Sequence, residues 1–278
     1  MALHAVSRAR LARRYRNRHR ERAAVTEGRR SVSPSIGSRE QETAIERAIS
    51  QEAHLSRALL GAGTTSIRLT SSGDPGRMYE AFFGLSQGIE RIGKLILVAD
   101  HYARTGAFMA PGDVERYRHD LKRLLKAVEG VATARDIHLD DSPSANTGSK
   151  AVIRFLTKFA ETDRYYNLNR LSQGDGVKID DPIAKWVKLV RAEASPRRRT
   201  LARDHQEAQN LAIARHMDEH VPLAILDFTS LSGTALNSYA AITKQTQLDE
   251  WVAVEGMLLA IRPIRFLSRT IASLDYVR

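Results

Sequence analysis

The sequence predicts an all-α fold, a bundle of roughly seven to nine helices that follows a disordered, basic N-terminal tail. Apolar residues recur at the helical period through most of the chain, and no segment sustains the two-residue alternation of a strand. Helix-start signals, in which a capping residue precedes proline, occur at Asp74-Pro75, Asp181-Pro182 and Ser195-Pro196. We therefore divide the chain into an arginine-rich tail, residues 1–38, and one all-helical domain, residues 39–278.

The composition indicates a protein with a substantial core that has neither disulfides nor a membrane-spanning segment. With 278 residues, 42% of them hydrophobic, the chain can bury a substantial core. It contains no cysteine, which excludes disulfides and thiolate metal sites and is compatible with a reducing compartment. The longest apolar run is far shorter than the ~20 residues that span a bilayer, and the apolar segment of a secretory signal is missing. We expect a cytoplasmic protein that does not enter a membrane.

The positive charge is concentrated in the tail. Of the net charge of +11, residues 1–30 contribute +8 through ten arginines and two glutamates, which leaves +3 for residues 31–278. Three interpretations of the tail stay open: a disordered segment that binds RNA, DNA or another polyanion, a transit-like peptide, or a dispensable extension. If the tail binds nucleic acid, the residues that we expect to contact phosphate are Arg13, Arg14, Arg16 and Arg18.

Each expected helix is justified by its apolar spacing and by the residues that bound it. The first runs from about Glu40 to Gly61 and is followed by a short extended link. The remaining expected elements are, in order, a long central helix at 75–104, a helix at 113–131, a loop at 134–150, a helix at 150–164, an irregular stretch at 163–181, helices from 182 through 190 and from 196 to 220, a helical element at 223–228, and a last helix at 248–276 that is bent or broken near Pro263.

The central helix, residues 75–104, organises the rest of the prediction. Its large apolar residues fall on one broad arc, whereas Gly84 and Gly88 lie four apart on the opposite side. Glycine inside a helix costs about 0.5–1 kcal/mol relative to alanine, so this pair predicts a closely packed neighbouring helix. Glu90 and Lys94 are spaced for a helical ion pair worth about 0.2–0.5 kcal/mol. We expect this helix to be packed on both sides.

A resemblance to a known family is carried by the central helix and the helix after it. Their sequences include FFGLSQGIERIGKLILVADHYARTG and ERYRHDLKRLLKAV. Together they resemble bacterial members of the HEPN superfamily (higher eukaryotes and prokaryotes nucleotide-binding), in which an E-x-x-x-K helix leads through a loop to an H-D-L-x-x-L helix. The matching residues are Glu90 and Lys94, then His119 and Asp120, and the resemblance covers residues 75–130 best.

The resemblance implies a helical bundle that forms a homodimer and is associated with RNA. Many such relatives belong to toxin–antitoxin or phage-defence systems, which implies an antitoxin or another protein partner. The active relatives are metal-independent endoribonucleases that share an R-x(4–6)-H motif. The arginine of such a pair can hold the scissile phosphate, and the histidine can move a proton to or from a ribose hydroxyl.

Six arginine–histidine pairs in this arginine-rich chain meet the loose spacing, and only one has a suitable polar residue directly after the arginine. That pair is Arg215 and His220, which we assign as phosphate clamp and general acid/base. His216 stands where the family usually has asparagine, and Asp218 and Glu219 would repel a phosphate. The alternative interpretation is an exposed helix end of mixed charge.

Two further features allow a binding or a structural interpretation. The cluster of Arg197, Arg198 and Arg199 contacts RNA or forms a solvated first helix turn. His119 is a second catalytic candidate or a structural hydrogen-bonding residue.

Metal and cofactor signatures are missing from the sequence. It has no phosphate-binding glycine loop, no dinucleotide fingerprint and no H-E-x-x-H motif. His216, Asp218 and His220 alternate at two residues, which splays them around a helix, so we expect no metal and no cofactor. Two hypotheses remain: a HEPN-like ribonuclease of toxin or defence type, and a non-catalytic helical protein that binds a protein partner, a nucleotide or RNA.

Overall fold

The computed structural model describes residues 36–71, 74–173, 181–194, 201–221, 228–231 and 234–274. The chain divides into two compact units, residues 1–47 and residues 48–278. The described part of the first unit is helical. The predicted boundary of the tail after residue 38 stays a prediction, because almost all of the tail lies outside the described residues.

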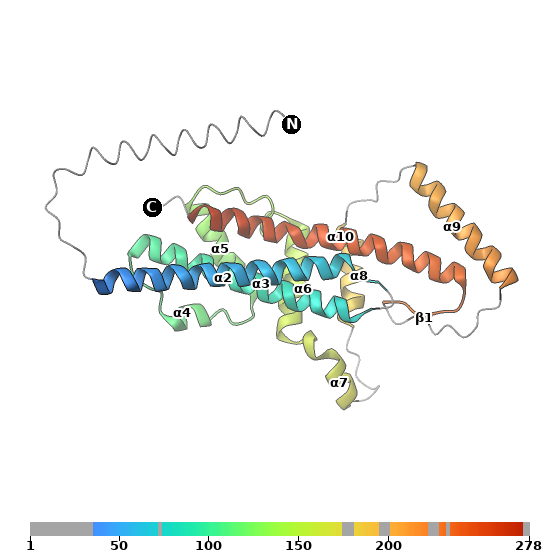
Figure 1. Cartoon of the computed structure of the whole chain (residues 1–278), viewed down its shortest axis with the longest axis horizontal. Coiled ribbons are helices and arrows are strands. Elements are labelled where there is room, and N and C mark those ends of the chain that lie inside the picture. Colours follow the sequence, from blue (N-terminus) through green and yellow to red (C-terminus); the bar gives the residue numbers. More distant parts are fainter. Residues whose placement is uncertain are drawn as a thin grey trace. The chain divides into compact units, whose positions relative to one another are not determined.

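The described residues form an all-α bundle, as predicted. They contain nine α-helices, one short 3₁₀ helix and one pair of two-residue strands (Figure 1). The elements are α2 (Ile36–Arg68), α3 (Gly76–Thr105), α4 (Pro111–Glu115), α5 (Leu121–Ala134), α6 (Thr147–Glu161), η2 (Asp163–Tyr165), α7 (Tyr166–Gln173), α8 (Pro182–Glu193), α9 (Leu201–His220), β1 (Phe228–Thr229), β2 (Ala235–Leu236) and α10 (Tyr239–Ala272). None of the helices in these ranges combines the length and the apolar character that a membrane span requires.

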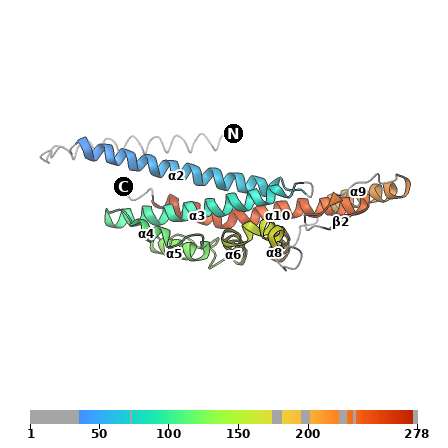
Figure 2. The ribbon, with the colours of Figure 1, turned by 90° about the horizontal axis from the view of Figure 1, so that it is seen from below.

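The helix α3 lies at the centre of the second unit. Figure 2 shows it with α10 in a middle layer, between the later turns of α2 on one side and α5, α6 and α8 on the other. Phe82 and Ile89 on α3 have no exposed surface. The ring of Phe82 lies 4.7 Å from that of Phe155 on α6 and 5.5 Å from that of Trp186 on α8. Aromatic side chains from three helices therefore fill the middle of the core, and the expectation that the central helix is packed on both sides is confirmed.

A close crossing of α2 and α3 uses the glycines that the sequence singled out. A Cβ on Gly84 would lie 2.9 Å from the carbonyl oxygen of Leu59 and 3.2 Å from the Cα of Gly63. A Cβ on Gly88 would lie 2.7 Å from the side chain of Leu60. The prediction of a closely packed neighbour is confirmed, because only residues without a side chain let two helix backbones approach this far.

The predicted end of the first helix near Gly61 was wrong. The helix α2 continues to Arg68, through a stretch that we expected to be extended. Gly63 faces α3, where its Cβ would lie 2.9 Å from the backbone nitrogen of Leu85, and Ile67 is fully buried. Contacts with α3 therefore outweigh the tendency of the glycines to end the helix.

The start of α3 also differs from the prediction, whereas its end agrees. Asp74 makes an ion pair of 2.8 Å with Arg77, and no side chain caps the helix. Gly106 ends α3 in the left-handed conformation, with φ of 68°, and its N–H donates to the carbonyl of Tyr102. This is the usual glycine stop signal.

The predicted helix at 113–131 is two helices. The short α4 ends at Glu115, and α5 begins at Leu121. Between them Arg118 has φ of 42°, and Asp120 caps α5 by accepting from the N–H of Arg123 at 3.0 Å. The left-handed residue interrupts one helix and the capping aspartate starts the next.

The stretch 163–181, which we expected to be irregular, contains η2 and α7. Residues 174–180 lie outside the described ranges. The cap predicted at Asp181-Pro182 is confirmed, since the Asp181 side chain accepts from the N–H of Ile183 at 2.9 Å.

The last third of the chain has a longer final helix than expected. The helix α10 begins at Tyr239, where Ser238 caps it by accepting from the N–H of Ala241 at 3.0 Å, and continues as a helix through Pro263. Most of the helical element expected at 223–228, and the cap expected at Ser195-Pro196, lie outside the described residues.

Candidate functional site

Three of the residues that carry the resemblance meet at one point of the structure. The carboxylate of Glu90, on α3, accepts from Lys94 Nζ at 2.7 Å through Oε1 and from His119 Nδ1 at 2.9 Å through Oε2. The side chain of Glu90 is 16% exposed and that of His119 is 48% exposed. A sheltered acid therefore holds a half-exposed imidazole, and the predicted Glu90–Lys94 ion pair is confirmed.

The turn before α5 places His119 beside Glu90. Arg118 occupies the left-handed region there, which non-glycine residues adopt uncommonly and which recurs at functional sites. Asp120 directly follows His119 and is committed to the start of α5. The H-D-L motif is thus a helix start in which the aspartate caps and the histidine reaches across to α3.

The contact with Glu90 fixes the tautomer of His119. An ionised carboxylate only accepts hydrogen bonds, so Nδ1 donates to Glu90 and Nε2 remains available as an acceptor. A histidine oriented by a carboxylate in this way suits general acid–base catalysis. The same contact also ties α3 to the turn before α5, so the geometry serves a structural role equally well.

Exposed cations lie along the same turn and the first turns of α5. They are Arg116, Arg118, Lys122, Arg123 and Lys126. The guanidinium carbons of Arg116 and Arg123 lie 5.1 Å and 5.7 Å from the ring centroid of Tyr117. The acids of this segment are Asp113 and Glu115, besides the capping aspartate, and Asp113 lies 3.8 Å from Arg116. The segment around His119 carries more positive than negative charge, which suits contact with a polyanion.

The predicted catalytic pair, Arg215 and His220, lies on α9. Both residues are exposed. Five residues of helix turn the chain by about 140° beyond a full turn, so the two side chains leave α9 on different sides. His220 Nδ1 lies 2.9 Å from the carbonyl oxygen of His216. One copy of the chain does not bring this pair onto one phosphate, and its assembly across a dimer stays a prediction.

The last turn of α9 groups a different set of side chains. His216, Glu219 and His220 each place a ligand-type atom within 4.8 Å of the others. Asp218 points elsewhere and accepts from the backbone N–H groups of Tyr239 and Ala240 at 2.6 Å and 3.1 Å. We expected no metal from the alternation of His216, Asp218 and His220; Asp218 is indeed turned away, but Glu219 joins the two histidines. The sequence signal that we missed is H-x-x-E-H. In this pattern the glutamate directly precedes the second histidine, whereas in H-E-x-x-H it directly follows the first.

The other predicted RNA contacts cannot be placed. The arginines of the tail and of the segment before α9 lie outside the described residues: Arg13, Arg14, Arg16, Arg18, Arg197, Arg198 and Arg199. Their role in RNA binding stays a prediction.

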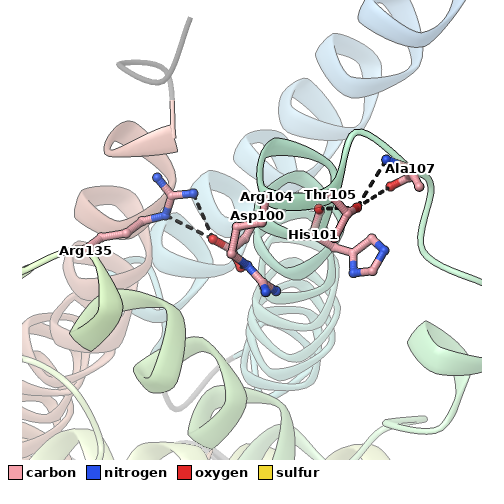
Figure 3. A network of polar contacts seen from close by, with 6 residues as sticks. All are labelled: Asp100, His101, Arg104, Thr105, Ala107 and Arg135. Carbon is pink, nitrogen blue, oxygen red and sulfur yellow. Dashed lines mark hydrogen bonds and ion pairs between the residues drawn. The ribbon is translucent and has the colours of Figure 1, made fainter.

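A buried acid that the sequence did not single out ties the ends of α3 and α5 together. Figure 3 shows Arg135 reaching Asp100, and Arg135 Nε and Nη2 donate to Asp100 Oδ1 at 3.0 Å and 2.8 Å. Arg104 Nε donates to Oδ2 of the same carboxylate at 2.8 Å. The Asp100 side chain is 7% exposed and that of Arg135 is 15% exposed. The D-x-x-x-R spacing of Asp100 and Arg104 could have predicted their ion pair. No pattern in the sequence indicates the contact with Arg135, which is 35 residues away from Asp100.

A second polar cluster joins α3, η2, α7 and α8. Lys185 Nζ lies 2.9 Å from Oδ2 of Asp163, which is 6% exposed. Burial, together with the nearby charge of Asp181, raises the pKa of Tyr79 to about 12, although a hydrogen bond with Asn167 opposes this. Burial also raises the pKa of Asp181. We interpret this cluster as a structural tie, because its charges pair within the fold.

A hollow of about 440 Å³ lies between α9 and α10. Its described lining includes Glu207 and Glu250 but neither lysine nor arginine. This lining does not suit the phosphates of a nucleotide, which cations or helix N-termini usually hold.

Comparisons of the chain with protein-family models, with curated proteins and with solved structures gave no match.

Proposed function

We propose that the chain is a HEPN-like, RNA-associated helical protein whose acid–base centre is Glu90 and His119. The contact between these two side chains is the observation that supports the proposal. They are 29 residues apart in the sequence, only the resemblance paired them, and His119 Nδ1 lies 2.9 Å from Glu90 Oε2. The setting in a toxin or phage-defence system, the homodimer and the protein partner rest on the resemblance.

In the proposed reaction Nε2 of His119 accepts the proton of a ribose 2′-hydroxyl while the 2′-oxygen attacks the adjacent phosphorus. The bond from phosphorus to the 5′-oxygen breaks, and the imidazolium or water returns a proton to the leaving 5′-oxygen. Glu90 orients the ring and stabilises the imidazolium that forms when Nε2 accepts the proton. The exposed cations of the turn and of α5 hold the RNA backbone. Independence of a metal ion rests on the resemblance. Removing a general acid–base group lowers a rate by about 10²–10⁴-fold.

A non-catalytic protein with the same fold is the second candidate. It is favoured by one observation, that Lys94 and His119 both donate to Glu90 while Asp120 caps α5. Both oxygens of Glu90, Nδ1 of His119 and the carboxylate of Asp120 thus have partners within the protein, as in a purely structural motif.

The test is RNA cleavage by the purified full chain in the presence of EDTA. We compare the wild type with His119→Ala, His220→Ala and, as a control on an exposed histidine away from both sites, His138→Ala. The proposal predicts loss of cleavage in His119→Ala only, with circular dichroism unchanged. Loss in His220→Ala alone would move catalysis to the Arg215–His220 pair. RNA that is bound but uncut at high protein concentration would leave the non-catalytic candidate as an RNA-binding protein. RNA that is neither bound nor cut would refute the proposal and leave the non-catalytic candidate with a protein or nucleotide partner.

A further inference from the structure

The end of α9 carries a cluster of metal-ligating side chains that plays no part in the proposed function. His216 and His220 are four residues apart on one face of the helix, with ring centroids 4.1 Å apart and planes tilted by 33°. The carboxylate of Glu219 completes a group whose ligand atoms lie within 4.8 Å of one another. We propose that His216, Glu219 and His220 bind a divalent transition-metal ion, of which Zn²⁺ is the best fit.

The hydrogen bonding of His220 leaves one of its ring nitrogens free for a metal. Its Nδ1 lies 2.9 Å from the carbonyl oxygen of His216, which can only accept, so Nδ1 donates. The lone pair on Nε2 is then free for a metal. Histidines that bind metals usually donate their other ring nitrogen to a backbone carbonyl or a carboxylate, which fixes both the tautomer and the ring orientation.

The distances require only side-chain movement. Tetrahedral Zn²⁺ with bonds of about 2.0–2.1 Å holds its ligand atoms about 3.3 Å apart. Ligand-type atoms of the three side chains already lie within 4.8 Å of one another, so side-chain rotation can bring the ligand atoms to this spacing. All three side chains are exposed, so their rotamers can change without disturbing the core.

The local charge also favours a cation. The cluster occupies the last turn of α9, where the helix dipole is negative. Glu219 adds a negative charge, and Arg215 leaves the helix about 100° away from His216. Two imidazoles and one carboxylate suit zinc and its neighbours in the first transition series, whereas Mg²⁺ and Ca²⁺ prefer oxygen ligands. Three protein ligands leave at least one position of the ion for water.

A bound ion would brace the junction between α9 and α10. It would link His216 to His220 across the same turn from which Asp218 accepts the two N–H groups at the start of α10. We therefore expect the ion to slow local opening of this turn.

The test uses the untagged full chain, with Zn²⁺ titrated by calorimetry and Co²⁺ followed by its visible absorption. The wild type is expected to bind one Zn²⁺ per chain at this cluster, and His216→Ala or His220→Ala to lower the affinity by at least about tenfold, since even loss of an outer hydrogen-bonding partner costs 10–100-fold. His205→Ala, an exposed histidine on the same helix, is the matched control and is expected to bind as the wild type does. Circular dichroism of each variant confirms that the helices are intact.

Hydrogen exchange gives a second readout that does not depend on the variants. Zn²⁺ is expected to slow exchange of the amides in the last turn of α9 and at the start of α10. The proposal is refuted if the wild type shows no saturable binding, or if His216→Ala and His220→Ala bind Zn²⁺ as tightly as His205→Ala.

Discussion

Replacing Gly84 by alanine tests the close crossing of α2 and α3. A Cβ at this position would meet the carbonyl oxygen of Leu59 at 2.9 Å and the backbone of Gly63 at 3.2 Å. Backbone atoms cannot rotate away as a side chain can, so the two helices must separate by several tenths of an ångström. Overpacking of a core costs about 1–3 kcal/mol, and the better helix propensity of alanine returns about 1 kcal/mol at most. We expect Gly84→Ala to lower the free energy of unfolding by about 1–2 kcal/mol.

The chain offers a matched control for this substitution. Gly61 lies on the same α2 helix, and a Cβ there would meet nothing within 4 Å. Gly61→Ala is expected to raise the free energy of unfolding by about 0.5–1 kcal/mol through helix propensity alone. Urea unfolding followed by circular dichroism measures both, with unchanged m values showing that the same surface is exposed. If Gly84→Ala stabilises the protein as much as Gly61→Ala does, the reasoning about the crossing is wrong.

Two further predictions concern buried polar groups. Asp100→Ala leaves the Arg135 guanidinium buried without its partner and is expected to lower the free energy of unfolding by about 3–5 kcal/mol. Arg104→Ala removes an arginine whose side chain is 62% exposed, so in the same urea assay it is expected to lower the free energy of unfolding by about 1 kcal/mol or less. Equal losses would contradict this difference. Because the pKa of Tyr79 is raised to about 12, its contribution to stability is complete below about pH 10 and is lost between about pH 10 and 12. Tyr79→Phe is therefore expected to lose less stability than the wild type over that range, and parallel pH profiles would show that Tyr79 titrates normally.

The helices were predictable where the signal is local. The apolar arc of α3, its glycine stop at Gly106 and the aspartate–proline start of α8 each depend on a few neighbouring residues. The glycine pair on α3 also predicted a close neighbour, because a cost to helix stability implies a compensating contact. These features need no knowledge of the rest of the fold.

The features that were missed depend on residues far apart in the sequence. Gly63 looked like part of a helix end and instead marks the crossing with α3. The break at Arg118 depends on a left-handed backbone conformation that its own sequence does not favour. Arg135 contacts Asp100 across 35 residues, which no periodic pattern shows.

The candidate site was only partly predictable. Spacing placed Glu90 and Lys94 together, and the resemblance selected His119, but only the fold brings His119 to Glu90. Spacing alone does not bring Arg215 and His220 together within one chain, because five residues along a helix separate the two side chains around its axis, and their assembly across a dimer stays a prediction. The four-residue spacing of His216 and His220 is the one that a helix turns into a shared site.

The central claim is that RNA binds the protein beside His119. The most direct measurement is ultraviolet crosslinking of RNA to the full chain, with the crosslinked peptides identified by mass spectrometry. We predict crosslinks within residues 116–126, which include the exposed cations of the turn and of α5. We also predict that Lys122→Ala combined with Arg123→Ala weakens these crosslinks. Crosslinks confined to residues 1–30, with none in residues 116–126, would contradict the claim and assign RNA contact to the tail alone.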